Sequence, residues 1–274
     1  MPESPASALP EQPWLSTDTH ATGILKEFLR FPLTETGVVF ERFLQLPGAV
    51  IHGSGRERVL YVEGARPSQT GRCLLVAHAD TVWDDYWVGA TNPAVAAPAR
   101  DPLVETNGVI RSADPARGLG ADDRAGLAIL WLLRDLGHSL MITDLEEQGR
   151  LGSSYLRNHE PEVLSKINRD HAFAIQFDRR NSRDYKCYDV GSGEFRAYLC
   201  DQTGYTEPDR RSFTDICTLC DPRGGGERMC GVNLSIGYYD EHSEDEHLVV
   251  GEWLNTLNLA RHWLSQSFIP HFRR

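Results

Sequence analysis

The sequence of 274 residues lacks any apolar run of the roughly 18 residues that a membrane-spanning helix needs. Its first twenty residues also lack the basic start and apolar core of a secretion signal. We therefore expect a cytoplasmic protein without a membrane partner. Basic residues are too few to balance the acidic ones. The resulting net charge of -11 makes nucleic acid an unfavourable partner as well.

Cysteine is also scarce. Six cysteines are too few for a disulfide framework in a chain of this length, so reduced thiols are expected. The pair Cys217-x-x-Cys220, with Cys187, Cys200 and Cys230 nearby in the sequence, leaves a structural zinc site or a redox pair as alternatives to buried thiols.

The composition is that of a globular protein. Hydrophobic residues make up 41% of the chain and charged residues 24%, enough for a large core. Residues 1–20 are rich in proline and are expected to form a poorly ordered tail. Because no internal repeat or linker divides the remainder, we predict a single domain over residues 21–274.

Short apolar runs alternate with segments of helical periodicity. Strands are predicted at residues 58–62, 73–77, 109–111, 138–145, 172–177, 195–200 and 232–237. Helices are predicted near residues 24–29, 38–46, 125–136, 153–158, 161–167, 212–220 and 248–264. This alternation predicts an α/β fold, a three-layer αβα sandwich around a mixed, mostly parallel sheet.

The stretch from Gly118 to Leu130 places Asp122 and Asp123 where a glycine-rich loop leads into an apolar-periodic segment. A carboxylate at a helix start accepts backbone N–H hydrogen bonds, so helix capping alone would explain both residues. Four other polar motifs also follow apolar runs. They are H-A-D at His78 to Asp80, E-E-Q-G at Glu146 to Gly149, F-D-R-R around Asp178, and H-S-E-D-E from His242.

Each of these motifs has a simpler explanation when it stands alone. His78 could hydrogen-bond a loop, the glutamates could begin a solvated helix, Asp178 could pair with the following arginines, and His242 could pair with neighbouring acids. However, ligands of parallel sheets bind outside the carboxyl ends of the strands, where these residues are expected. Together they form a set of imidazole and carboxylate donors that suits a catalytic zinc site.

In this order the motifs resemble those of the co-catalytic dizinc exopeptidases, the clan of carboxypeptidase G, peptidase T, aminoacylase and the leucyl-type aminopeptidases. The match covers H-x-D, G-A-D-D-(K/R)-A-G, E-E-x-G, D and H-x-x-x-E, from about Cys73 to Glu246. The resemblance implies a zinc-exopeptidase fold of the phosphorylase/hydrolase-like kind. The interval between Asp178 and His242 is too short for the lid domain of larger members, so a compact form is expected.

The resemblance also implies a metal centre. Its five ligands would be His78, Asp122, Glu147, Asp178 and His242. His78 and Asp178 would hold one Zn²⁺, Glu147 and His242 would hold the other, and Asp122 would bridge them. Co²⁺ or Mn²⁺ could occupy the same nitrogen and oxygen donors.

By the same resemblance, Asp80 would fix the imidazole of His78 and Glu146 would be the general base toward water. We therefore expect a zinc-dependent hydrolase of amide bonds, an aminopeptidase or dipeptidase acting on small peptides. A carboxypeptidase or a deacylase of acylated amino acids is the alternative, and a non-catalytic metal-binding recognition protein is the second alternative. The sequence allows an oligomer but does not predict one.

The sequence does not decide whether the free ammonium or the free carboxylate of the substrate is recognised. A free ammonium needs a carboxylate, for which the candidates are Asp84, Asp85, Asp240 and Glu241. A free carboxylate needs a cation, for which the candidates are Arg179 and Arg180. Tyr238 and Tyr239 could line the pocket, donate to an oxyanion, or pack in the core.

Overall fold

The computed structural model describes residues 18–84, 102–208, 212–221 and 227–274. Most of the predicted tail lies outside this part of the chain, and residues 19 and 20 already belong to the first helix. The helices are α1 (Thr19–Leu29), α2 (Gly37–Leu44), α3 (Ala121–Leu133), α4 (Leu151–His159), α5 (Pro161–Asp170), α6 (Gly193–Thr203), α7 (Asp215–Leu219) and α8 (Val250–Leu264). No helix of the described residues is long and apolar enough to span a membrane.

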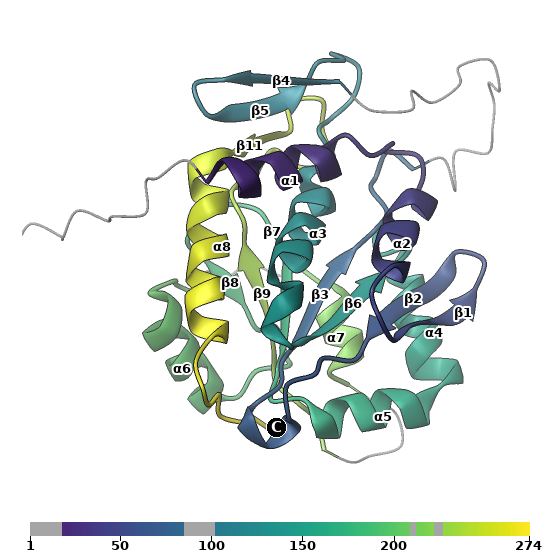
Figure 1. The fold of residues 1–274 in the computed structure, drawn as a ribbon, viewed down its shortest axis with the longest axis vertical. Coiled ribbons are helices and arrows are strands. Elements are labelled where there is room, and N and C mark those ends of the chain that lie inside the picture. The colour runs from purple at the N-terminus through teal and green to yellow at the C-terminus, as the bar shows by residue number, and fades with distance from the viewer. Residues whose placement is uncertain (1–17, 85–101, 209–211, 222–226) are drawn as a thin grey trace, which may run out of the picture.

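A seven-stranded sheet runs through the middle of the molecule in the order β1-β2-β6-β3-β7-β9-β8 (Figure 1). Its strands are β1 (Ala49–Ser54), β2 (Glu57–Val62), β3 (Leu74–His78), β6 (Ser139–Thr143), β7 (Ala174–Arg179), β8 (Tyr185–Lys186) and β9 (Gly231–Ser235). The four central strands, β6, β3, β7 and β9, are parallel to one another, while β1, β2 and β8 are antiparallel additions at the two edges. The predicted mixed, mostly parallel sheet is thus confirmed.

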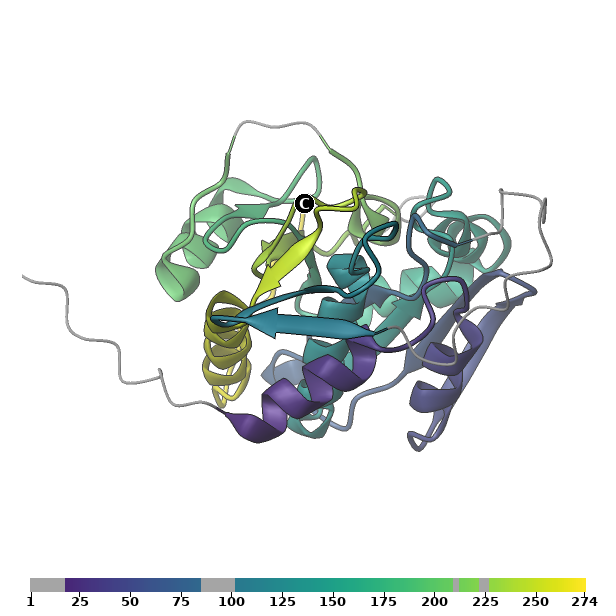
Figure 2. The same ribbon diagram turned by 90° about the horizontal axis from the view of Figure 1, so that it is seen from above.

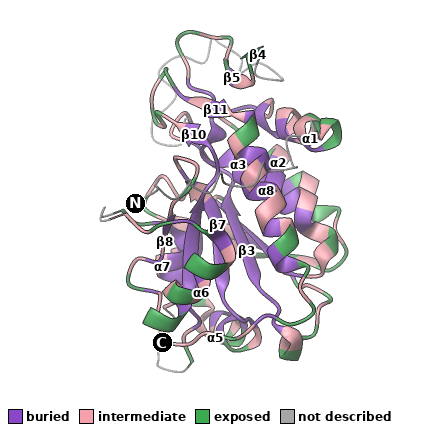
Figure 3. Cartoon of the chain, turned by 90° about the vertical axis from the view of Figure 1, so that its left-hand side faces the viewer, coloured by how far each residue is buried: buried purple, intermediate pink, exposed green. Residues whose placement is uncertain are grey.

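Helices cover both faces of this sheet and give the predicted three-layer αβα sandwich. α1, α2, α3 and α8 lie on one face, and α4, α5 and α7 lie on the other (Figure 1). Alternate residues of β3 enter the two cores, because successive side chains of a strand point to opposite faces. Leu75 and Ala77 pack toward α3, whereas Leu74 and Val76 pack toward α4 and α5. The central strands are consequently buried over their length (Figure 3).

A second, antiparallel sheet closes the top of the molecule. It consists of β4 (Leu103–Thr106), β5 (Val109–Ser112), β10 (Tyr238–Tyr239) and β11 (His247–Val249), in the order β10-β11-β5-β4. Figure 2 looks down on this sheet and shows the hairpin of β4 and β5 beside α1. Lys26 of α1 and Glu105 of β4 form an ion pair there. The sheet lies at the carboxyl ends of the parallel strands. β11 leads directly into α8, and β5 leads through a loop to α3.

One predicted strand is wrong. Residues 195–200 form the middle of α6, whose start is capped by Ser192 accepting from the backbone N–H of Phe195. The β-favouring aromatic residues of this segment instead pack as a helix face. Phe195 contacts the ring of Phe173, and Tyr198 contacts the rings of Phe173 and Trp263. Five strands of the described residues, β1, β4, β8, β10 and β11, were not predicted, and the last helix begins at Val250 because Leu248 and Val249 belong to β11.

Candidate metal centre

The polar residues singled out in the sequence gather at one end of the main sheet. His78 ends β3, Asp178 lies near the end of β7, and Glu147 follows β6 in a turn. Asp122 stands at the start of α3, and His242 lies in the loop between β10 and β11. All but His78 line a pocket with a volume of about 230 Å³, and His78 lies directly behind it, almost fully buried.

Asp122 lies between the two histidines. Its Oδ1 is 2.9 Å from His78 Nε2, and its Oδ2 is 3.2 Å from His242 Nε2. His78 Nε2 also lies 3.5 Å from Asp178 Oδ1, and His242 Nε2 lies 2.8 Å from Glu147 Oε1. Two groups, each of one imidazole and one carboxylate, therefore share the carboxylate of Asp122.

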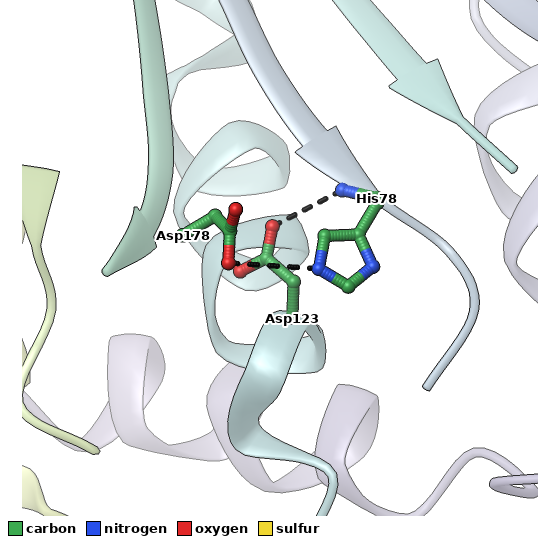
Figure 4. A group of neighbouring side chains, drawn as sticks. All are labelled: His78, Asp123 and Asp178. Atoms are coloured by element: carbon green, nitrogen blue, oxygen red, sulfur yellow. Dashed lines mark hydrogen bonds and ion pairs between the residues drawn. The ribbon is translucent and has the colours of Figure 1, made fainter. Parts of the chain in front are cut away.

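Asp123 is directed elsewhere, although it too approaches His78 and Asp178 (Figure 4). Its Oδ2 accepts from the backbone N–H of His78 at 3.1 Å, and its Oδ1 accepts from the backbone N–H of Gly126 at 3.1 Å. Neither aspartate has helical dihedral angles, so the regular turns of α3 begin after Asp123. Asp123 is the helix cap, and Asp122 is free of that role.

The backbone of Asp80 orients the imidazole of His78. His78 Nδ1 lies 3.0 Å from the carbonyl oxygen of Asp80 and 3.4 Å from its Oδ1. Because both of these atoms are acceptors, Nδ1 carries the proton and Nε2 faces the pocket side. The Asp80 carboxylate itself accepts from the backbone N–H groups of Glu146 and Glu147, at 2.9 and 3.1 Å, and so holds their turn against β3.

Asp178 and Asp122 are held by further side chains. Asp178 Oδ2 accepts from Thr214 Oγ1 at 2.7 Å and from Gln176 Nε2 at 3.0 Å, which leaves Oδ1 facing His78. The buried Glu246 accepts from the backbone N–H groups of Gly120 and Asp122, at 2.6 and 3.1 Å. In the sequence, Glu246 was noted only for its spacing from His242, which does not reveal that it anchors the loop before α3.

Several carboxylates in the pocket have shifted pKa values. Burial, together with the charge of Asp122, raises the pKa of Asp178 to about 7. Burial raises the pKa of Glu146 well above its ordinary value and raises that of Glu147 as well. Burial acts in the same direction on Asp122, but its hydrogen bonds with His242 and His78 outweigh it and lower the pKa. Such a concentration of buried negative charge is favourable only beside cations.

The donor set fits divalent cations of the zinc type. Ligand atoms of His78, Asp122 and Glu147 lie within 4.8 Å of one another, as do those of His78, Asp123 and Asp178. Glu147 Oε1 is buried and accepts no hydrogen bond of acceptable geometry from the described residues, despite its short distance to His242. Imidazole nitrogen and carboxylate oxygen are the donors of catalytic zinc sites. Two cations could thus be held here, with Asp122 shared between them.

The candidates for substrate recognition lie in different places. Glu241 lines the pocket and pairs with Arg180, with Oε1 and Nη1 2.6 Å apart. Asp84 is instead buried beside Arg56, and Asp240 is an exposed residue near His247. Asp85 lies outside the described residues.

The predicted cation candidates and the tyrosines also differ in their contacts. Arg179 is buried in an ion pair with Asp184, at 2.5 Å between Nε and Oδ1. Tyr238 lines the pocket and donates to Asp178 Oδ1 at 3.4 Å, whereas Tyr239 donates to Glu252 at 2.6 Å. Tyr238 is therefore part of the pocket wall, and Tyr239 is not among the lining residues.

The cysteines contribute nothing to a metal site in the described part of the chain. All six are free thiols, and the groups with converging ligand atoms contain only histidine, aspartate and glutamate. Burial raises the pKa of Cys217 to about 11 and that of Cys220 well above its ordinary value. These are the properties of packed thiols, because reactive or metal-binding cysteines have lowered pKa values.

Comparison of sequences and comparison of structures give different results. No protein-family model matches the sequence, and a search of curated proteins finds no match. Aminopeptidase PepT from Bacillus cereus ATCC 10987 is similar in structure, with a TM-score of 0.60 and 12% identity over 91% of this chain and 98% of that one. Aminopeptidase APDkam598 from the archaeon Desulfurococcus kamchatkensis has a TM-score of 0.58 and 13% identity over 90% and 95%.

The TET1 peptidase of Pyrococcus horikoshii matches with a TM-score of 0.54 and 13% identity, over 90% of this chain and 99% of that chain. This chain has the fold of these peptidases. The resemblance to the co-catalytic dizinc exopeptidases is thereby confirmed at the level of the fold. The expected compact form also agrees, because the described residues between Asp178 and His242 form β8 and β9 of the main sheet, β10 of the second sheet, and the helices α6 and α7.

Proposed function

We propose that this protein is a metal-dependent aminopeptidase with two zinc ions, acting on small peptides. The observation that carries the proposal is the position of Asp122, whose two oxygens face two different imidazoles, each with its own carboxylate. A fold does not fix a function, so the geometry of this site is the main support. The similarity to aminopeptidase structures adds to it.

These contacts support an assignment of ligands. His78 and Asp178 would hold one ion, Glu147 and His242 would hold the other, and Asp122 would be shared. When bound, the two cations supply Lewis-acid activation of the attacking water and of the substrate carbonyl. The Nδ1 hydrogen bond of His78 to Asp80 orients the ring for coordination through Nε2.

Glu146 is the general base of this proposal. Its side chain lines the pocket next to Glu147, and no described side chain donates a hydrogen bond to it. The backbone of the Glu146 turn is fixed by Asp80, so the carboxylate is held while its oxygens stay available. It accepts a proton from the attacking water and delivers that proton to the leaving amine.

Glu241 is the proposed partner of the substrate's ammonium group. Of the described candidates for this role it is the one that lines the pocket, and its Oε2 is buried without a hydrogen bond from the described residues. Arg180 binds the other oxygen, so the position of Glu241 is fixed. A buried carboxylate oxygen without a donor is costly, and an ammonium group offers three N–H donors.

The test of the reaction is the Glu146→Gln variant, measured on unblocked aminoacyl amides with zinc content determined in parallel. We expect kcat/KM to fall by about 10²–10⁴ while zinc binding is retained, because proton transfer is lost and the ligands are not. Glu160→Gln, remote from the pocket, is the matched control and should keep full activity. A Glu146→Gln variant with wild-type turnover would refute the assignment of the base.

The test of polarity compares an aminoacyl amide with an N-acyl amino acid. The proposal expects the free amine to be required, and expects Glu241→Gln to raise KM for the aminoacyl amide by about tenfold or more, as for loss of a charge-assisted hydrogen bond. A preference for the N-acyl amino acid would instead favour a carboxypeptidase or deacylase that uses Arg180. Zinc binding without turnover of either substrate would favour the recognition protein.

A further inference from the structure

Tyr188 is a pocket residue that the sequence did not single out. It follows β8 and lines the pocket together with Asn233 and Ser212. Its hydroxyl oxygen lies 3.2 Å from Asn233 Nδ2 and 3.5 Å from Ser212 Oγ. Since both of these contacts belong to the pocket wall, the hydroxyl end of Tyr188 lies in that wall too.

The direction of these hydrogen bonds follows from Asn233. Its Oδ1 accepts from the backbone N–H of Asp178 at 3.0 Å, which identifies the other end of the amide as the nitrogen. That nitrogen donates to the carbonyl oxygen of Asp178 at 2.7 Å and to Tyr188. An amide nitrogen only donates, so the hydroxyl oxygen of Tyr188 is an acceptor in this contact.

The hydroxyl proton of Tyr188 is therefore left for another partner. Ser212 also donates to the hydroxyl oxygen, and no described residue accepts the proton. The other pocket tyrosine differs in this respect, because Tyr238 donates its proton to Asp178. Among the described residues of the pocket wall, Tyr188 is thus the one whose hydroxyl proton remains available for a hydrogen bond to a ligand.

Tyr188 is held firmly with respect to the proposed metal centre. Asn233 contacts both backbone groups of Asp178 and the hydroxyl of Tyr188, so it sets the spacing between them. Arg196 Nη2 donates to the backbone carbonyl of Tyr188 at 2.8 Å. Burial raises the pKa of Tyr188 above its ordinary value, which keeps the phenol protonated at neutral pH.

We propose that the hydroxyl of Tyr188 donates a hydrogen bond to the carbonyl oxygen of the scissile amide and to the oxyanion that forms when water adds to that carbonyl. The inference rests on the proposed hydrolytic function. Tyr188 keeps its proton throughout, and its effect grows as negative charge develops on the oxygen. A donor fixed before the reaction stabilises the transition state more than the ground state.

The kinetic test is Tyr188→Phe, with Tyr239→Phe as a matched control whose hydroxyl faces Glu252 and not the pocket. For Tyr188→Phe we expect kcat on an aminoacyl amide to fall by about 10²-fold, as for loss of one oxyanion donor. KM and zinc content should change little. Tyr239→Phe should keep kcat. A Tyr188→Phe variant that keeps wild-type kcat, or an equal loss in both variants, would overturn the role of Tyr188.

A binding measurement separates this role from a structural one. A phosphinate analogue of the tetrahedral intermediate should bind Tyr188→Phe about 10²-fold more weakly than it binds the wild-type protein, as expected from the same donor. A reduced-amide analogue, which lacks the oxygen, should bind both proteins equally. Equal weakening of both analogues would overturn the inference. A wild-type protein without zinc-dependent turnover would overturn the proposed function, and the role of Tyr188 with it.

Discussion

Asp122 and Asp123 are neighbours in the chain, yet their carboxylates face different partners. Asp123 uses both oxygens on backbone N–H groups, those of His78 and Gly126. Asp122 uses both on imidazoles. Capping and metal ligation were competing explanations for the pair, and the contacts assign one task to each residue. The ligand role of Asp122 remains a prediction.

Replacement by asparagine distinguishes the two aspartates. For Asp122→Asn we expect zinc content to fall below half of the wild-type value, because the carboxylate proposed to be shared by both ions is lost. Asp123→Asn should keep its zinc but lose about 1–3 kcal/mol of unfolding free energy, since its amide nitrogen would face a backbone N–H. Metal analysis and urea unfolding measure these effects. Loss of zinc from Asp123→Asn but not from Asp122→Asn would mean that Asp123 is the ligand and Asp122 the cap.

The two halves of the centre also differ in exposure. The side chain of His78 is 1% exposed and that of Asp178 is 8% exposed, whereas that of His242 is 48% exposed. We expect chelators to remove first the ion that His242 is proposed to hold, because this histidine can turn toward solvent. His242→Ala should retain about one zinc per chain, and titration with a chelator should show two steps in the wild-type protein. A single step that removes both ions would contradict this.

At the level of elements, the turn that carries Glu146 and Glu147 is anchored to the antiparallel edge of the sheet. The fully buried Asp144 at its start accepts from Arg56 Nε at 2.9 Å and from Arg58 Nε at 3.1 Å. Thr36 Oγ1, which precedes α2, donates to the same carboxylate. Elements far apart in the sequence therefore set the position of the proposed base.

Arg56→Met tests this anchoring, since Arg56 also pairs with the buried Asp84. We expect a loss of about 2–4 kcal/mol in unfolding free energy, because the buried Asp84 and Asp144 both lose the charge of Arg56, while Arg58 still pairs with Asp144. The position of Glu146 should be disturbed, and kcat should fall as well. Arg117→Met is the control, because its contact with Asp114 is a 4.0 Å surface pair worth about 0–1 kcal/mol. Equal stability of the two variants would contradict the anchoring.

At the level of the whole molecule, two buried histidines that join distant segments bear on stability. His138 lies between the backbone N–H of Cys73 and the carbonyl of Leu264, and His171 lies between the carbonyl of Ile167 and Ser139 Oγ. Each has one donor and one acceptor as partners, which fits a neutral ring. Burial lowers the pKa of His138 to about 4 and that of His171 to about 3.

The stability of the protein should therefore fall on acidification. An unfolded histidine has a pKa of about 6.5, so below this pH the unfolded chain binds protons that the folded chain does not. Each histidine then costs about 1.4 kcal/mol per pH unit, from pH 6.5 down to its folded value. His171→Asn should be less stable at pH 7.5 but show a shallower fall between pH 6.5 and 4.5. Parallel curves for the two proteins, measured by urea unfolding, would contradict this assignment.

The sequence by itself determined the α/β class, most of the strands and helices, and the positions of the polar motifs at strand ends. Hydrophobic periodicity carries this information because it is local, with period 2 for strands and 3.6 for helices. The strand predicted from this periodicity at residues 195–200 is wrong. The aromatic residues there favour a strand locally, but in the structure they pack as part of a helix against Phe173 and Trp263.

Only the tertiary structure decided which side chains face one another. In the structure the carboxylates of Asp122 and Asp123 face different groups. Glu241 lines the pocket, whereas Asp84 pairs with Arg56, and the hydroxyl of Tyr188 accepts a hydrogen bond from Asn233. These contacts join residues tens of positions apart, and their direction depends on how helices and strands pack. No local pattern records that packing, which is why the sequence could name candidate residues for the proposed site but not their individual partners.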